Sequence, residues 1–243
     1  MTTIIYSLVE GIVASLIAVA LLEIYRACRR FLSHRAIRRI LGKSERIGIV
    51  APSYPQTRNP LSAGLLTTDN AFALAEIIDA CRKIGAESVL SPVARIADNF
   101  PDDLVLLGGH IANDLTCRFL KDYCTGFEIH GAMEDSSERP ANDIFYSCAG
   151  RDFVDTDQDA WAFIAKLSSG LTRSPRTVVM IWGRSSFGTA AAAHFLTNRA
   201  HLLNANRAQS LFCVLRMSRQ LNYQSLPAEI IDLTDRVFRI SDS

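Results

Sequence analysis

Short apolar runs that alternate with segments of helical period constrain the fold of this chain more than any other feature. Three of these runs each lead through a loop that contains glycine or proline into a helical segment. The three predicted units are the strand 46–52 with the helix 68–85, the strand 104–107 with the helix 113–126, and the strand 177–182 with a helix that Thr189 caps. Such alternation is typical of parallel sheets covered by helices. The sequence therefore predicts an α/β domain with a largely parallel sheet and helices on both faces.

The remaining segments are shorter or less regular. Further strands are predicted at 87–93, at 127–129, at 144–148, and at the end of the chain in 211–217 and 228–240. The pattern of 160–167 fits a strand or a short helix equally well. The polar region between about 127 and 159 is expected to form loops and edge strands.

The N-terminus carries an apolar run beside a basic cluster. Fifteen of the nineteen residues from Ile4 to Leu22 are apolar, and as a helix they would extend about 28 Å, close to the thickness of a bilayer core. Seven Lys or Arg and no acid follow between Arg26 and Lys43. This pattern predicts a transmembrane helix in 1–25, a basic juxtamembrane linker or helix in 26–43, and a domain in 44–243. The positive-inside rule places the N-terminus outside and the domain in the cytoplasm, as a single-pass protein of the cell (inner) membrane.

Two other interpretations of the apolar run fit less well. A cleavable signal peptide requires positive charge before the run, and here the charge follows it. A buried core helix does not explain why basic residues lie on one side only. Glu10 within the run either lies near the outer headgroups or pairs in a homo-oligomer, which the small residues Gly11 and Ser15 would favour.

Charge and cysteine usage exclude some classes of function. Without the seven basic residues of 26–43, 19 basic and 25 acidic residues remain, a formal charge of −6. Nucleic acid is therefore not expected as the partner, and the basic cluster is explained by the lipid bilayer. The six cysteines form no CxxC pair, so reduced thiols and no metal site are expected. The one metal alternative combines Cys117 and Cys124 with His110 or His130.

The loop "GRSSFGT" is the first candidate for ligand contact. Gly183 and Gly188 would let backbone N–H groups approach an anion, Thr189 would cap a helix whose positive end favours negative charge, and three more side chains add donors. Those donors belong to Arg184, Ser185 and Ser186. The loop is neither a P-loop nor a GxGxxG motif. The alternative is a tight corner that needs glycine for steric reasons alone.

The loop "GGHIAND" is the second candidate. Gly108 and Gly109 permit a sharp turn close to a ligand, Asn113 could bind a base or ribose, and His110 lies at the tip. As a general base, His110 would need a carboxylate, for which Asp114 is the nearest in sequence. The structural alternative is that the glycines make the turn and Asn113 or Asp114 caps the helix.

Two elements of this kind resemble a poorly characterised group of bacterial Rossmann-like proteins. The elements are a strand followed by GGxxxN and a strand followed by GxxxxGTxxA, within Arg46 to Arg219. The resemblance implies a Rossmann-like fold and shared positions at Gly108, Gly109, Asn113, Gly183, Gly188 and Thr189. More distantly, the layout is similar to nucleotide sensors and to TIR or deoxyribosyltransferase-like domains. Those enzymes use a helical glutamate, for which Glu76 is the nearest analogue.

Three functions follow as hypotheses. The first is a membrane-anchored domain that binds a nucleotide, an NAD-like molecule or a nucleotide-derived signal, as a stress or antiviral-defence effector. The second is a hydrolase or transferase of NAD or nucleoside glycosidic bonds, with Glu76, Asp103 or Asp114 as the carboxylate. The third is a scaffold that docks a protein partner, in which the glycine loops are only structural.

Overall fold

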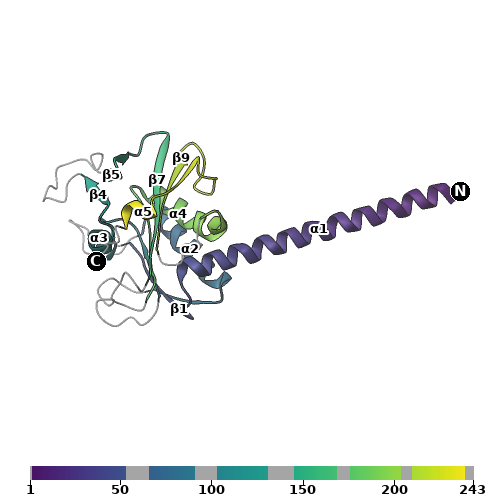
Figure 1. The fold of residues 1–243 in the computed structure, drawn as a ribbon, viewed down its shortest axis with the longest axis horizontal. Coiled ribbons are helices and arrows are strands. Elements are labelled where there is room, and N and C mark those ends of the chain that lie inside the picture. Colours follow the sequence, from purple (N-terminus) through teal and green to yellow (C-terminus); the bar gives the residue numbers. More distant parts are fainter. Residues whose placement is uncertain are drawn as a thin grey trace.

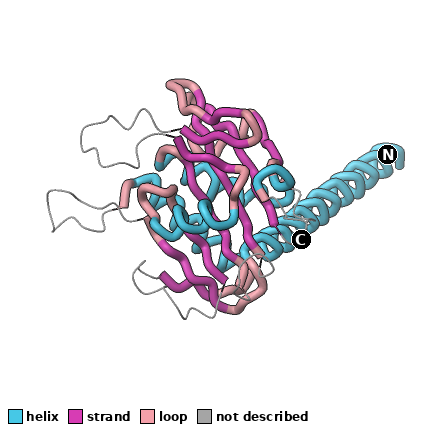
Figure 2. The backbone as a smooth tube through the Cα atoms, turned by 60° about the vertical axis from the view of Figure 1, so that its left-hand side comes forward, coloured by secondary structure: helices cyan, strands magenta, loops and turns pink. Residues whose placement is uncertain are grey.

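A seven-stranded sheet forms the centre of the protein (Figures 1 and 2). The computed structural model describes residues 2–52, 66–90, 103–130, 145–168, 176–203 and 210–238, apart from the side chains of residues 2–14 and 29. The strands of the sheet are β1 (Arg46–Val50), β2 (Glu87–Leu90), β3 (Asp103–Leu107), β7 (Asp159–Leu167), β8 (Val178–Gly183), β9 (Ser210–Ser218) and β10 (Glu229–Asp232). Their order across the sheet is β10-β9-β7-β8-β3-β1-β2.

The sheet is mixed, which corrects the prediction of a largely parallel one. Strands β2, β1, β3 and β8 pair in parallel, whereas β7 runs antiparallel to both β8 and β9, and β10 runs antiparallel to β9. Parallel neighbours need a crossover of a dozen or more residues, usually a helix, whereas antiparallel neighbours need only a short connection. Only ten residues separate the end of β7 from the start of β8. The segment 160–167, which the pattern left undecided, therefore forms a strand that turns back beside its neighbour.

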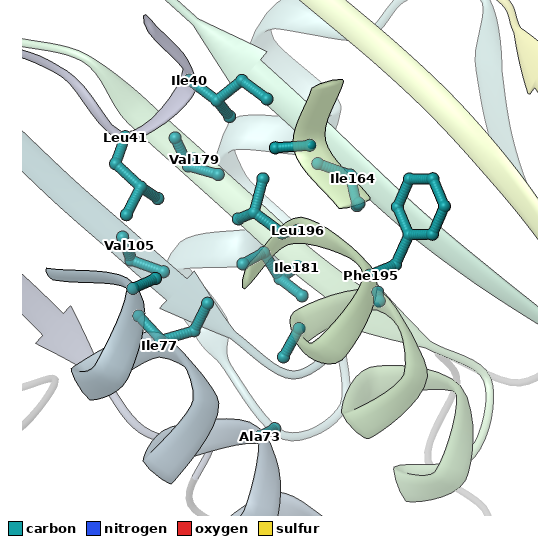
Figure 3. Packing of buried hydrophobic residues seen from close by; sticks show 14 of the residues in the cluster. Ile40, Leu41, Ala73, Ile77, Val105, Ile164, Val179, Ile181, Phe195 and Leu196 are labelled. Carbon is teal, nitrogen blue, oxygen red and sulfur yellow. The ribbon is translucent and has the colours of Figure 1, made fainter. Parts of the chain in front are cut away.

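Three helices cover one face of this sheet. They are α2 (Thr68–Lys83), α4 (Ser186–Arg199) and the C-terminal end of α1 (Thr2–Leu41). Figure 3 shows Ile77 of α2 and Leu196 of α4 directed toward Val105 and Ile181 of the sheet. The alanine run of α4 is fully buried, so its small side chains let the helix lie close to the strands.

The opposite face carries a second layer of different composition. It consists of α3 (Asp114–Tyr123), the short α5 (Thr234–Val237) and a three-stranded antiparallel sheet of β4 (Phe127–His130), β5 (Phe145–Cys148) and β6 (Arg151–Phe153). Aromatic rings fill this core, with Phe163 stacked on Trp182 at a centroid distance of 5.1 Å. The region expected to be loops and edge strands thus supplies a small sheet.

Helix α1 is continuous through both N-terminal segments and extends away from the domain (Figure 1). In the part of the chain that the structure describes, no helix combines the length and the apolar character that a membrane span requires. This finding contradicts the predicted transmembrane helix, the outside orientation of the N-terminus and the inner-membrane location. Glu10 and Gly11 lie outside the residues whose side chains are described.

The C-terminal turns of α1 belong to the core of the domain. Ile37, Ile40 and Leu41 are at most 1 % exposed and pack in the same cluster as α2 and α4. Figure 3 shows Ile40 and Leu41 in this cluster. Lys166 of β7 donates a hydrogen bond from Nζ to the carbonyl oxygen of Arg39 at 2.7 Å. Because the last carbonyls of a helix have no partner within it, this bond satisfies one of them. The basic segment 26–43 therefore ends as an integral part of the fold.

Candidate functional site

Three predicted loops leave the sheet at the same edge. Strands β1, β3 and β8 are parallel, with Val50 beside Leu106 and Leu107 beside Ile181. The segments that follow their carboxyl ends, from Ala51, Gly108 and Arg184, therefore start side by side. In open α/β sheets this edge is where ligands bind. Most of the first loop, residues 53–65, lies outside the described residues.

The two glycines of "GRSSFGT" bring strand and helix into backbone contact. A Cβ atom on Gly183 would lie 2.6 Å from the Cα of Gly188, and one on Gly188 would lie 2.7 Å from the carbonyl oxygen of Trp161. Both distances are shorter than side chains tolerate. The glycines are thus required by packing between β8, β7 and α4, whether or not a ligand binds.

Several polar groups of the same corner are already paired. The N–H of Gly183 donates to Oγ1 of Thr189 at 3.1 Å, and the N–H of Thr189 donates to the carbonyl oxygen of Ser185 at 3.2 Å. Ser185, not Thr189, is the N-cap of α4, since its Oγ accepts from the N–H of Gly188. Ser186 donates to Asp69 of α2 at 2.9 Å. Gly183, Gly188, Thr189 and Ser186 therefore have structural roles.

The corner "GGHIAND" is similar. Gly108 has a φ of +89°, and a Cβ atom there would lie 2.7 Å from Cβ of Pro52. Asn113 caps α3, because its Oδ1 accepts from the N–H groups of Leu115 and Thr116 while its Nδ2 donates to the carbonyl oxygen of Leu107. Every polar atom of the Asn113 side chain is thus used within the fold.

His110 lies below this edge, buried beside an aromatic partner. Its Nδ1 is 3.3 Å from the hydroxyl of Tyr146 on β5, and its ring is 6 % exposed. Burial lowers the pKa of His110 to about 4, so the ring is neutral at neutral pH. Its Nε2 has no hydrogen-bond partner among the described residues. Tyr146, rather than the predicted Asp114, is therefore the partner of His110. The ring is a neutral imidazole held beside a tyrosine hydroxyl, and no carboxylate within the described part of the chain is placed to activate it as a general base.

A polar cleft of about 680 Å³ opens at the same edge, and we call it the edge cleft. It is lined by Val154, Asp155, Thr156, Asp157, Arg184, Ser185 and Arg219. Ser185 caps α4, so the positive end of that helix reaches the cleft wall. Of the ten predicted site residues, the edge cleft takes Arg184 and Ser185. Gly109 lies close to the end of β8, since a Cβ atom on it would be 3.5 Å from the carbonyl oxygen of Gly183.

Asp155 organises the wall of the edge cleft. Its Oδ2 accepts from Arg219 at 2.6 Å and from the hydroxyl of Ser185 at 3.3 Å, and its Oδ1 accepts from the N–H of Trp161 at 2.9 Å. The carboxylate is 6 % exposed, whereas the guanidinium of Arg219 is 32 % exposed. Arg219 is thus held in place at the cleft by a buried carboxylate.

The carboxylates proposed for catalysis lie elsewhere. Asp103 stands at the start of β3, at the opposite edge, where it accepts from the N–H groups of Ser44 and Thr177. Glu76 lies between α2 and α4 and pairs with His194 at 2.7 Å. Asp114 is exposed in the first turn of α3. None of the three lines the edge cleft.

The cysteines show no arrangement suited to a metal ion. All six are free, and burial raises the pKa of Cys124 to about 12. Within the described ranges, no group of three or more His, Cys, Asp or Glu side chains is placed to hold a metal. The combination of Cys117 and Cys124 with a histidine does not form.

Sequence reasoning missed Tyr146, Asp155 and Arg219. Arg219 directly follows β9, and because β9 is antiparallel to β7, it reaches the same edge as the end of β8. An arginine after an apolar strand was the only local signal. Comparison with known proteins finds no family model that matches the chain and no curated protein of significantly similar sequence.

Proposed function

We propose that the protein binds a nucleotide, or a related small molecule with a phosphate, in the edge cleft. The observation that carries this proposal is a cleft of about 680 Å³ at the carboxyl ends of the strands, with Arg184 and Arg219 in its wall beside the N-terminus of α4. Ligand sites commonly occupy about 300 to 1,000 Å³. Arginine pairs with phosphate through two parallel hydrogen bonds, and a helix N-terminus favours the same charge.

The cleft also offers groups for the neutral part of a nucleotide. Asp157 brings carboxylate oxygens that can accept from ribose hydroxyls. In this arrangement Arg184 takes the phosphate, and Arg219, which Asp155 holds, supports it. The more distant similarity of the predicted layout to nucleotide sensors points in the same direction, and a role as a stress or defence effector is an extension by analogy.

No observation favours the alternative of a glycosidic-bond hydrolase. Its three carboxylates are used at helix ends, at the opposite edge or between helices. The scaffold alternative draws on the close packing of Gly183 and Gly188, which needs no ligand. The nucleotide-binding function and the scaffold function differ in whether any small molecule stabilises the fold.

Thermal unfolding of the full chain with a ligand panel tests the proposal. The panel contains nucleoside mono-, di- and triphosphates, cyclic dinucleotides, and NAD species. A ligand at a hundred times its dissociation constant adds about 2.7 kcal/mol, which corresponds to a rise in Tm of about 5 to 10 °C for a domain of this size. At least one member is expected to give such a rise.

Arg184→Ala supplies the site-specific variant and Arg118→Ala the matched control. Arg118 is exposed on α3 and does not line the edge cleft. The ligand-induced rise in Tm is expected to shrink in Arg184→Ala and to persist in Arg118→Ala. A panel without any shift in the wild type, or an equal shift in both variants, would reject the edge cleft as the binding site.

A further inference from the structure

A second cleft, of about 400 Å³, lies where α1 passes the C-terminal ends of α2 and α4. Five basic side chains line it: Arg26, Arg30, His34, Lys83 and Arg199. Because α2 and α4 both start at the edge that holds the edge cleft, their C-terminal ends lie at the far end of the helical layer. This basic cleft is therefore separate from the proposed nucleotide site.

The basic residues of α1 form a row along one side of the helix. Arg26, Arg30 and His34 are each four residues apart, so their Cα atoms are about 6 Å apart along the axis. Arg199, at the end of α4, faces this row across the cleft. Positive groups are thus distributed along the cleft rather than gathered at one point.

Lys83 is held in position by the domain. Its Nζ donates to Oδ1 of Asn198 at 3.2 Å and lies 2.9 Å from Asp79. Asn198 in turn donates to the carboxylate of Glu76, which pairs with His194. A chain of hydrogen bonds between α2 and α4 therefore orients the cation before any ligand arrives.

The balance of charge around the cleft is positive. Three acids lie next to it, and each is paired: Glu23 with Arg26, Asp79 with Lys83, and Glu76 with His194. No acid of the described ranges lines the cleft itself. Among the described residues, Arg30 and Arg199 have no ion-pair partner, and both side chains are solvent-accessible. Each can offer its full fork of donors to an anion.

We propose that the basic cleft binds a small anion with two or more linked phosphates. A single phosphate or sulfate would reach only one end of the row, whereas a chain of phosphates can contact α1 and Arg199 together. Arginine pairs with phosphate oxygens through two parallel hydrogen bonds, which add geometric specificity to the attraction of charge. The bound anion joins α1 to the ends of α2 and α4, and so fixes the direction in which α1 leaves the domain.

Isothermal titration calorimetry of the full chain with sodium tripolyphosphate tests this proposal. Sodium sulfate at equal ionic strength is the comparison, and tripolyphosphate is expected to bind at least tenfold more tightly. The double variant Arg30→Ala, Arg199→Ala is expected to weaken tripolyphosphate at least tenfold. Arg35→Ala removes one positive charge from the exposed surface of α1 outside the cleft, and its affinity is expected to stay within twofold of the wild type.

Three results would overturn the proposal: no binding of tripolyphosphate by the wild type, equal affinity for sulfate, or equal losses in Arg35→Ala and in the double variant. Circular dichroism confirms that the variants are folded, as expected for exposed and half-exposed positions. Arg184→Ala separates the two sites, because tripolyphosphate affinity that falls in this variant and not in the double variant assigns the anion to the edge cleft and contradicts a second site.

Discussion

Close backbone contact at Gly183 is the residue-scale feature that most constrains the edge of the sheet. Any Cβ atom there meets the backbone of Gly188 and Thr189 at 2.6 to 2.9 Å. Gly183→Ala is expected to lower the free energy of unfolding by about 1 to 3 kcal/mol, toward the upper end of this range. The reason is that backbone atoms cannot move aside as flexible side chains do. Urea unfolding measures the loss.

Gly85→Ala is the control for Gly183→Ala. Gly85 has a φ of +74° and open space around its Cα, so alanine there costs only backbone strain, roughly 1 kcal/mol. Equal losses at the two positions would show that the contact between β8 and α4 is looser than described.

His110 gives the stability of the fold a specific dependence on pH. Burial lowers its pKa from 6.5 to about 4, so below pH 6.5 the unfolded chain binds a proton that the folded protein does not. Stability is therefore complete above pH 6.5 and is lost as the pH falls toward 4. Between pH 7.5 and 5.0 the wild type should lose about 2 kcal/mol more than His110→Gln.

Urea unfolding of both proteins at the two pH values measures this difference. Other titrating groups contribute equally to wild type and variant, so the comparison isolates the imidazole. Parallel losses in the two proteins would mean that His110 is not buried as a neutral ring.

Single residues of the edge cleft were only partly predictable from the sequence. Arg184 and Ser185 were found because they follow a clear strand and precede a clear helix. Asp155 and Arg219 are 64 residues apart, and only the antiparallel pairing of β7 and β9 brings them together. Local pattern carries no information about such a pairing, so that half of the cleft could not be inferred.

At the scale of elements, the C-terminal turns of α1 are core despite their basic composition. Ile40 is 1 % exposed against α2, α4 and the sheet. Ile40→Ala is expected to lower the free energy of unfolding by about 2 to 5 kcal/mol, because it leaves a cavity. Leu32→Ala, at a position that is 54 % exposed, should change it by less than about 0.5 kcal/mol. Chemical unfolding measures both variants. If Ile40→Ala and Leu32→Ala lower the free energy of unfolding by similar amounts, the end of α1 is not packed on the domain.

Lys166 ties the end of α1 to the sheet. It is 8 % exposed and donates to the carbonyl oxygen of Arg39. Lys166→Met keeps the length and loses the donor, so the last turn of α1 should open more often, with amide hydrogen exchange in 36–41 at least tenfold faster. If amide hydrogen exchange in 36–41 is the same in Lys166→Met and in the wild type, the hydrogen bond from Lys166 does not hold the end of α1.

Helices and central strands were predicted well because their signals are local. The segment 68–85 was predicted as a helix that begins at a polar cap and stops at Gly85, and α2 forms there with Thr67 as its cap. The interpretation of the N-terminus was wrong because an apolar run beside basic residues favours a span. The burial of Ile37 and Ile40 among those basic residues gives the segment a place in the core, and sequence composition alone does not show it.

At the scale of the whole molecule, the mixed sheet decides which segments meet. The reversal of β7 places the start of that strand and the end of β9 beside the end of β8, so the edge cleft combines parallel and antiparallel parts of the sheet. A largely parallel sheet, as expected from the alternation of elements, would not bring Asp155 and Arg219 to Arg184. The prediction of strands alternating with helices was thus correct for most elements, and the predicted fold was wrong about the directions of β7, β9 and β10.

Hydrogen–deuterium exchange of the full chain, with and without the nucleotide that raises Tm most, tests the central claim most directly. If the edge cleft is the binding site, exchange slows in 154–157 and 184–189 and stays unchanged in α3. Protection that is confined to 26–34 and 197–199, or absent from the loops after β8 and before β7, would contradict it.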